Sequence, residues 1–329
     1  MSDDVTRAPR DRRRPGDTTG PQRRELPTVV RFDESRRSVI ERRARRGELV
    51  RVRRGRYVAP EPAAGGVAVQ REQQVLALVA AVAQTLRTDY CFSHESAALV
   101  HGLSVYRLAD EVHVSQSWKP KVRRDRDDRV RRHPVDVPPR DRTTTPTGLP
   151  VTTLERTTVD CGRWLAGARA LVVADSALRA GADRAVVDKI LHDAAGRPGI
   201  RQARLVVDLA DARAESPGES LVRWSVHEAG IDLPDLAVEV QTWRGTAWVD
   251  LGWPELRVGI EFDGAVKYSG GEHGDPRERL LAEKRRHDAL TEAGWTILRV
   301  TWDDLAHPDR LVARIRRARA AARRRGTVR

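Results

Sequence analysis

Three acidic residues lie close together toward the C-terminal end of the sequence, inside two apolar runs that are typical of β-strands. Asp250 lies in the first run, and Glu261 and Asp263 lie in the second, on either side of a turn predicted at 254–257. In a hairpin, Asp250 and Glu261 would be cross-strand partners, and Asp263 would share their face because strand side chains alternate. Carboxylates held so close repel one another, and a divalent cation is the usual remedy. The alternative is a surface hairpin with scattered acids, although the apolar neighbours favour a central strand.

The composition favours a polyanionic partner. The 329 residues carry a formal net charge of +13, which points most simply to nucleic acid, unless the chain reflects a generally Arg-rich proteome. The only cysteines, Cys91 and Cys161, lie far apart, which predicts two buried thiols in a reducing cytoplasm and no zinc site or disulfide framework. No apolar run is long enough for a spanning helix, and no signal peptide is predicted.

The N-terminal part predicts a disordered basic tail over 1–27 and a small folded module over 28–60. In this module a short helix carries Val39 and Ile40 inward and ends near Gly47, and a hairpin turns at Arg54-Gly55. Residues 45–58 resemble the winged-helix domain of abortive-infection (AbiEi-type) antitoxins, whose first helices would have to lie upstream. The resemblance implies that arginines contact the phosphates of nucleic acid: Arg45, Arg46, Arg51, Arg53, Arg54 and Arg56.

Residues 67–213 predict a mostly helical middle region with a small sheet, which resembles the same antitoxin-like family at 93–103. His94 and His101 are seven residues apart, too distant on a helix to share an ion, so structural roles are expected. Thr152 and Glu155 match a capping box at the start of a helix. The basic loop at 119–126, between two predicted strands, is interpreted either as a phosphate contact or as a solvated hairpin tip.

Residues 214–329 predict a helix, three strands, a helix, a strand and a final basic helix. This order resembles the PD-(D/E)XK nuclease superfamily, and within it the very-short-patch-repair-type endonucleases. The segments that carry the resemblance are Gly218-Glu219-Ser220 with Arg223, Trp248-Val249-Asp250, Glu261-Phe262-Asp263-Gly264 with Lys267, Glu283-Lys284-Arg285-Arg286 and Gly294-Trp295-Thr296-Ile297. The sequence departs from the superfamily at Asp263, which stands where a lysine is expected. The predicted fold class is therefore α/β (α+β), with a C-terminal mixed sheet of about four strands flanked by helices.

The resemblance implies a role for each matched residue. Asp250 and Glu261 are expected to bind Mg²⁺ or Mn²⁺, with Asp263 as a further ligand and Glu219 reaching the same site. Either Lys267 or Lys284 would replace the missing lysine. The remaining assignments are phosphate contacts for Arg223 and Arg285 and solvated positions for His273 and His287.

The expected function is metal-dependent hydrolysis of phosphodiester bonds, with DNA as the substrate, in bacterial defence, repair or a toxin–antitoxin-like system. A protein partner encoded nearby fits that setting, and no membrane partner is expected. The alternative is a non-catalytic DNA-binding transcriptional regulator or antitoxin, in which the nuclease-like fold only binds.

Overall fold

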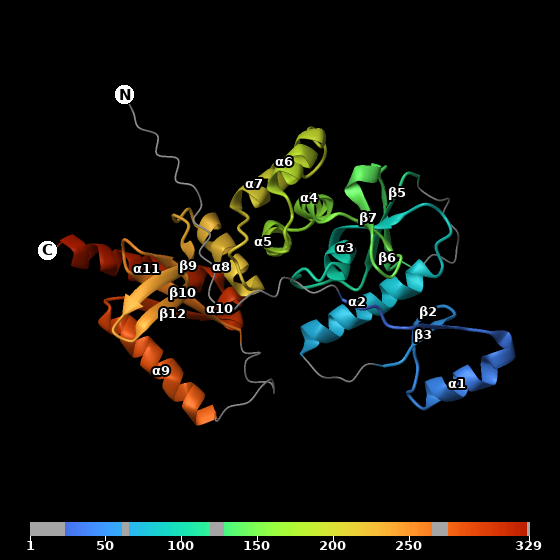
Figure 1. Ribbon diagram of the computed structural model, residues 1–329, viewed down its shortest axis with the longest axis horizontal. Helices are drawn as coiled ribbons and strands as arrows, with labels where there is room; N and C mark the ends of the chain where they lie inside the picture. Colours follow the sequence, from blue (N-terminus) through green and yellow to red (C-terminus); the bar gives the residue numbers. More distant parts are fainter. Residues whose placement is uncertain (1–23, 61–65, 119–127, 265–275, 328–329) are drawn as a thin grey trace. The chain divides into compact units, whose positions relative to one another are not determined.

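The computed structural model describes residues 24–60, 66–118, 128–264 and 276–327 (Figure 1). Over these residues the fold is mixed α/β, with three sheets among its helices. The described residues fall into two compact units that divide after Leu221. Among the helices of the described residues, none is both long enough and apolar enough to cross a membrane.

The N-terminal end of the described chain forms a three-stranded antiparallel sheet in the order β1-β3-β2. The elements are β1 (Val29–Arg31), α1 (Arg37–Arg45), β2 (Val50–Arg53) and β3 (Arg56–Val58). Gly55 turns the β2–β3 hairpin at a φ of 67°, which glycine adopts without a Cβ clash. The predicted helix and hairpin are confirmed, but only Ile40 is buried. Val39 is 42% exposed, because adjacent helical residues point about 100° apart.

A five-stranded sheet in the order β6-β5-β4-β8-β7 follows. Its strands are β4 (Cys91–Phe92), β5 (Val112–Gln116), β6 (Val130–Pro134), β7 (Arg142–Thr144) and β8 (Pro150–Thr152), and the helices beside it are α2 (Val67–Ala83) and α3 (His94–Val100). Phe92 and Val114 from the strands and Leu78 and Leu99 from the helices share one core.

The pairing of β5 with β6 is parallel, with Val112 opposite Val130 and Gln116 opposite Pro134. The hairpin interpretation of the basic loop is therefore wrong, because a hairpin joins antiparallel strands and parallel strands need a longer crossover. Residues 119–127 of that loop lie outside the described residues.

Four helices complete this unit: α4 (Leu154–Trp164), α5 (Gly167–Arg179), α6 (Arg184–Asp193) and α7 (Ile200–Leu209). Thr153 caps α4 by accepting a hydrogen bond from the Arg156 amide. The predicted capping box is therefore wrong by one residue, and Glu155 instead accepts from the Asp183 amide in the loop between α5 and α6. Cys161 of α4 is a buried free thiol, as is Cys91 of β4, as predicted.

The C-terminal unit begins within helix α8 and is built on a four-stranded sheet in the order β12-β11-β10-β9. The elements are α8 (Pro217–Glu228), β9 (Asp235–Thr242), β10 (Gly245–Trp253), β11 (Val258–Asp263), α9 (Pro276–Glu292), β12 (Thr296–Thr301), α10 (Trp302–Ala306) and α11 (Pro308–Thr327). β9, β10 and β11 form an antiparallel meander, whereas β12 pairs with β11 in parallel after the α9 crossover. The mixed four-stranded sheet predicted for the C-terminal part is thus confirmed.

Helices lie on both faces of this sheet. Leu290 of α9 packs with Val238 and Val249 from the sheet. Phe262 points to the other face, where its ring meets Trp302 of α10 with centroids 4.9 Å apart. Because side chains alternate along β11, Glu261 faces α9 while Phe262 faces α10.

Candidate metal centres and nucleic-acid contacts

Asp250 and Glu261, here called the acid pair, lie on the two central strands of the C-terminal sheet. The β10–β11 pairing ends at Leu251 opposite Ile260, one residue short of Asp250 and Glu261, so the cross-strand pairing of these two acids stays a prediction. Oδ2 of Asp250 accepts a hydrogen bond of 2.9 Å from the Phe262 amide. This bond fixes the Asp250 carboxylate beside the residue that follows Glu261.

Arg286 of α9 is a cation that contacts Glu261 of the acid pair. Its Nη2 lies 2.7 Å from Oε1 of Glu261, and it also donates to the Trp248 carbonyl at 2.5 Å. The contact with Glu261 is close enough for an ion pair but does not have the geometry of a hydrogen bond. The buried Oε1 therefore has no hydrogen-bond partner among the described residues. Lys284 is exposed, since two residues along a helix turn through about 200° and point it away from Arg286.

Asp263 and His287 are among the other residues considered for this site that the structure describes. Asp263 is half-buried at the end of β11, and the three carboxylates are not among the groups of the described chain that could hold a metal ion as they stand. Lys267 and His273 lie outside the described residues. His287 is half-buried, with Nδ1 enclosed and without a hydrogen-bond partner in the described chain, so the predicted solvated position is wrong.

Glu219 and Arg223 are both buried on α8, with exposures of 6% and 5%. The Glu219 carboxylate accepts from the Glu215 amide at 2.9 Å and from the Ser216 hydroxyl at 2.8 Å. Ser216 accepts in return from the Glu219 amide, so the pair caps the start of α8. These hydrogen bonds give Glu219 a capping role at the start of α8. The burial of Arg223 leaves little guanidinium surface for a phosphate.

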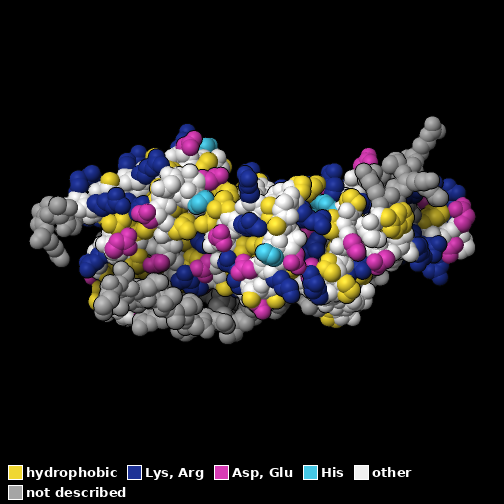
Figure 2. Space-filling view, turned by 90° about the horizontal axis from the view of Figure 1, so that it is seen from above, with side chains coloured by type: hydrophobic (Ala, Val, Ile, Leu, Met, Phe, Trp, Pro, Cys, Tyr) yellow, Lys and Arg dark blue, Asp and Glu magenta, His cyan; other side chains and the backbone are white. Residues whose placement is uncertain are grey.

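The predicted nucleic-acid contacts of the N-terminal module lie on α1 and on the β2–β3 hairpin. Arg45, Arg46, Arg51 and Arg54 are exposed, whereas Arg53 and Arg56 are half-buried, and Arg285 of α9 is exposed. Burial lowers the pKa of Arg56 from its usual value, and the nearby charges of Arg31, Arg53 and Arg87 lower it further. These four guanidinium groups form a local excess of positive charge, here called the arginine cluster. Elsewhere, on the face drawn in Figure 2, basic side chains are interleaved with acidic ones.

A second candidate metal centre, which the sequence analysis missed, lies in the first unit. His94 at the start of α3, His113 on β5 and His133 on β6 are brought together by the fold, and we call them the histidine trio. One ligand atom from each lies within 4.8 Å of the others. His113 Nδ1 is 3.0 Å from His133 Nε2, and the His94 ring stacks on the His133 ring with centroids 3.8 Å apart.

The surroundings of the histidine trio keep it neutral. Its members are 7%, 1% and 8% exposed, in sequence order. Burial lowers the pKa of His113 to about 4 and of His133 to about 3, and it holds the pKa of His94 well below the usual value. Trp164, at the end of α4, stands edge-on to the trio, with its centroid 4.9 Å from that of His133. His101, seven residues after His94, is not part of the trio. It contacts the Thr152 carbonyl at 2.7 Å, in a structural role as predicted.

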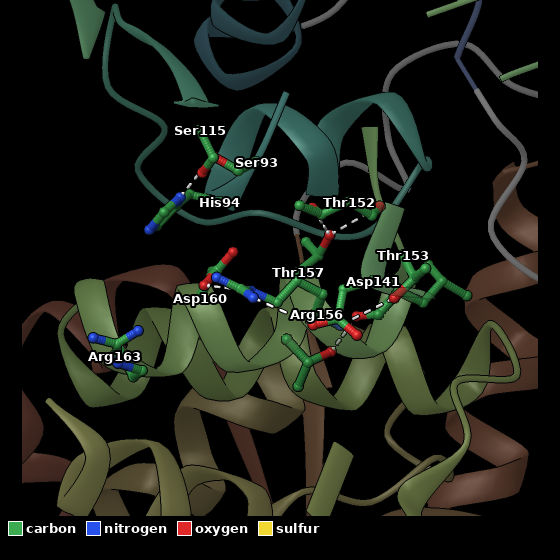
Figure 3. Close-up of polar contacts among 12 residues, drawn as sticks. Ser93, His94, Ser115, Asp141, Thr152, Thr153, Arg156, Thr157, Asp160 and Arg163 are labelled. Atoms are coloured by element: carbon green, nitrogen blue, oxygen red, sulfur yellow. Dashed lines mark hydrogen bonds and ion pairs between the residues drawn. The ribbon is translucent and has the colours of Figure 1, made fainter. Parts of the chain in front are cut away.

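A buried ion network lies on α4, near the trio. Nε of Arg156 donates to Oδ1 of Asp160 at 2.9 Å, and its Nη1 donates to Oδ2 of Asp141 at 3.3 Å. Figure 3 shows Arg156 between these two carboxylates, and His94 bonded to Ser93 beside them. The network contains no titratable histidine or thiol and is best understood as a structural tie between α4 and the segment that precedes β7.

Comparison with known proteins gives relatives without an assigned activity. No protein-family model matches the sequence. Two proteins of Mycobacterium tuberculosis, uncharacterized protein Rv2248 of strain H37Rv and uncharacterized protein MT2308 of strain CDC 1551 / Oshkosh, are 37% identical over 164 residues, or 49% of this chain. The chain spans 58% of the length of these curated relatives. A crystal structure of the RV2827C protein from the same species matches at 16% identity and a TM-score of 0.36, over 57% of this chain and 79% of that one. That likeness is too weak to carry an argument.

Proposed function

We propose that the C-terminal unit is a metal-dependent nuclease that hydrolyses phosphodiester bonds of DNA, with the acid pair as ligands of Mg²⁺ or Mn²⁺. The acid pair itself carries the proposal. Two carboxylates lie on neighbouring central strands, and the Glu261 side chain is only 13% exposed. Carboxylates in such a position need a compensating cation, a role that Arg286 now has for Glu261 and that a bound metal ion would take over.

The donor set suits the proposed ion. Mg²⁺ prefers hard oxygen ligands and is commonly held by one or two carboxylates, with waters and substrate phosphates in its other positions. Oε1 of Glu261 is a buried oxygen without a hydrogen-bond partner among the described residues. The carboxylate of Asp250 is held in place by the hydrogen bond that its Oδ2 accepts from the Phe262 amide. When bound, the ion would neutralise the scissile phosphate and lower the pKa of a water.

Arg286 replaces the lysine as the proposed cation of the site. Its guanidinium lies against Glu261, whereas Asp263 occupies the lysine position and Lys284 points away. An arginine stays protonated in proteins, so Arg286 can stabilise negative charge on a phosphate but cannot accept a proton from water. The proposal therefore gives Arg286 a phosphate-positioning role. The ion pair with Glu261 has to yield as the metal binds.

The test is cleavage of a panel of duplex, single-stranded and mismatched DNA and of RNA, with Mg²⁺ or Mn²⁺ and with EDTA. We expect metal-dependent cleavage by the wild type and a loss of at least about 100-fold in Glu261→Gln and Asp250→Asn, the scale of a group that acts on developing charge. Glu239→Gln, on edge strand β9 and exposed, is the matched control and should cleave normally. Equal cleavage by wild type and Glu261→Gln would identify a contaminant and refute the proposal.

The arginine cluster favours a second candidate function, a non-catalytic DNA-binding regulator or antitoxin. Four guanidinium groups gathered on and around one small sheet repel one another, and a phosphate backbone would relieve that repulsion. If no nucleic acid is cut, salt-sensitive DNA binding should remain. Arg31→Gln, an exposed member of the cluster, should then lower the slope of log affinity against log salt by about 0.9. Arg37→Gln is the control, because Arg37 already pairs with Glu34 and Glu41.

A further inference from the structure

The histidine trio comes close to the dimensions of a metal site. In tetrahedral zinc sites the metal–nitrogen distance is about 2.0–2.1 Å, which sets ligand nitrogens roughly 3.3 Å apart. His113 Nδ1 and His133 Nε2 are 3.0 Å apart, and the full set of three ligand atoms falls within 4.8 Å. The backbone of His94 is also strained, because its φ of 52° lies in the left-handed region that non-glycine residues seldom occupy.

The second nitrogens of two trio members face oxygen atoms. Nδ1 of His94 lies 2.9 Å from Oγ of Ser93, which also accepts a hydrogen bond from Ser115. Nε2 of His113 lies 3.6 Å from Oε1 of Glu111, beyond hydrogen-bond range, and is buried without a partner in the described chain. Histidines that bind metals usually donate their other N–H to a hydroxyl, carbonyl or carboxylate, which fixes the tautomer and the ring orientation, and the His94–Ser93 contact has this form.

A metal-free trio leaves two features without compensation. One is the enclosed Nε2 of His113, since a buried polar atom without a partner costs stability. The other is the strained backbone of His94. A close-packed apolar cluster at these positions would carry neither cost. An ion shared by all three rings would require His94 to tilt out of its stack on His133, after which the remaining His113 N–H could close toward Glu111.

We propose that His94, His113 and His133 bind one divalent transition-metal ion, with Zn²⁺ as the first candidate, at a site distinct from the acid pair. Three neutral imidazoles suit Zn²⁺, Co²⁺, Ni²⁺ or Cu²⁺ and offer nothing to Mg²⁺, which prefers oxygen. Three protein ligands also leave a coordination position for water or another small ligand, as in catalytic rather than purely structural zinc sites. The inference uses none of the residues of the proposed nuclease, so either can fail without the other.

The test uses the full chain without a histidine tag, freed of metal by a chelator and titrated with Zn²⁺ and Co²⁺ by calorimetry and visible absorption. We expect one equivalent of either ion to bind, with ligand-field bands in the Co²⁺ spectrum. A roughly 100-fold excess of Mg²⁺ should not compete, because Mg²⁺ prefers oxygen ligands to imidazole. His133→Gln and His113→Gln should bind at least about 100-fold more weakly, since each removes a direct ligand. Two controls should bind like the wild type: His192→Gln, on an exposed turn of α6, and Glu261→Gln.

A variant-free measurement keeps the proposal testable if a trio variant fails to fold. Imidazole ¹⁵N signals of the wild type should change for three histidines on addition of one equivalent of Zn²⁺, and the others should stay in place. The proposal is overturned by binding well below one equivalent, or by trio signals that stay unchanged. Equal affinity in folded His133→Gln and wild type would also overturn it.

Discussion

Replacing Arg156 by methionine removes the cation of the buried network while keeping most of the side-chain volume. Arg156 is 8% exposed, and its two partners Asp160 and Asp141 are 2% and 4% exposed. Asp141 retains a second guanidinium, because Arg140 lies 3.7 Å from its Oδ1. Asp160 is worse placed, since its Oδ2 is already buried without a hydrogen-bond partner among the described residues. The substitution therefore leaves one carboxylate buried and uncompensated.

The expected cost is about 3–5 kcal/mol at pH 7.5, the range for breaking a buried ion pair from one side. The cost should depend on pH. Burial raises the pKa of Asp160 while Arg156 opposes that rise, so Arg156→Met should raise it further. A folded pKa above the unfolded value of about 3.9 means that the folded chain takes up a proton first as the pH falls. The deficit of the variant should thus be largest near neutral pH and shrink toward pH 4.

The assay is urea unfolding followed by circular dichroism at several pH values, with separate transitions fitted separately because the chain has two compact units. Arg140→Met is the matched control. Its pair with Asp193 is 62% and 46% exposed, so the loss should be below about 1 kcal/mol. The double variant Arg156→Met/Asp160→Asn should recover much of the stability, because the uncompensated charge is gone. A loss below about 1 kcal/mol for Arg156→Met, or a deficit that does not change with pH, would refute the reasoning.

Two glycine substitutions test close packing in the two units by the same unfolding assay. Gly199→Ala should cost about 2–4 kcal/mol, because φ is 78° and the new Cβ would lie 2.2 Å from the Arg163 carbonyl oxygen. Gly196→Ala, with a φ of 76° but nothing within 4 Å, should cost only about 1 kcal/mol, and equal costs would contradict the clash. Gly259→Ala should cost about 1–3 kcal/mol, because its Cβ would meet side chains of two neighbouring strands at 2.7 and 2.8 Å. Gly252→Ala, whose nearest contacts are 3.2 Å, should cost less; the reverse order would count against this packing.

Much of the fold follows from local patterns in the sequence. The β2–β3 hairpin is marked by alternating residues around Arg54-Gly55, and helix α8 begins at Pro217 as the proline predicts. The β10–β11 register is also local, because a short turn fixes which residues face each other, as in the pairing of Trp253 with Val258. These features depend on neighbours within a few residues along the chain.

The features that the sequence did not reveal depend on contacts between distant segments or on the phase of a helix. Local spacing compares His94 only with His101, which is too distant on a helix to share an ion, whereas the neighbours of His94 in the fold come from β5 and β6. Their approach depends on the parallel pairing of those strands, which no local pattern encodes. On α9 the motif suggested Lys284, but the inward face is set by Leu290 in the sheet core, and Arg286 shares that face.

The parallel pair β11–β12 has a consequence for how the C-terminal unit is made. The meander of β9, β10 and β11 can form as soon as it is synthesised, because each strand pairs with the one before it. Until Thr296–Thr301 has been added, however, β11 is an open edge with unpaired backbone groups, although it carries buried residues such as Ile260 and Phe262. Pairing across the α9 crossover is non-local and therefore slow. We expect this interval to be the point at which the nascent chain is most prone to aggregate, and a chain that stops before β12 to be insoluble.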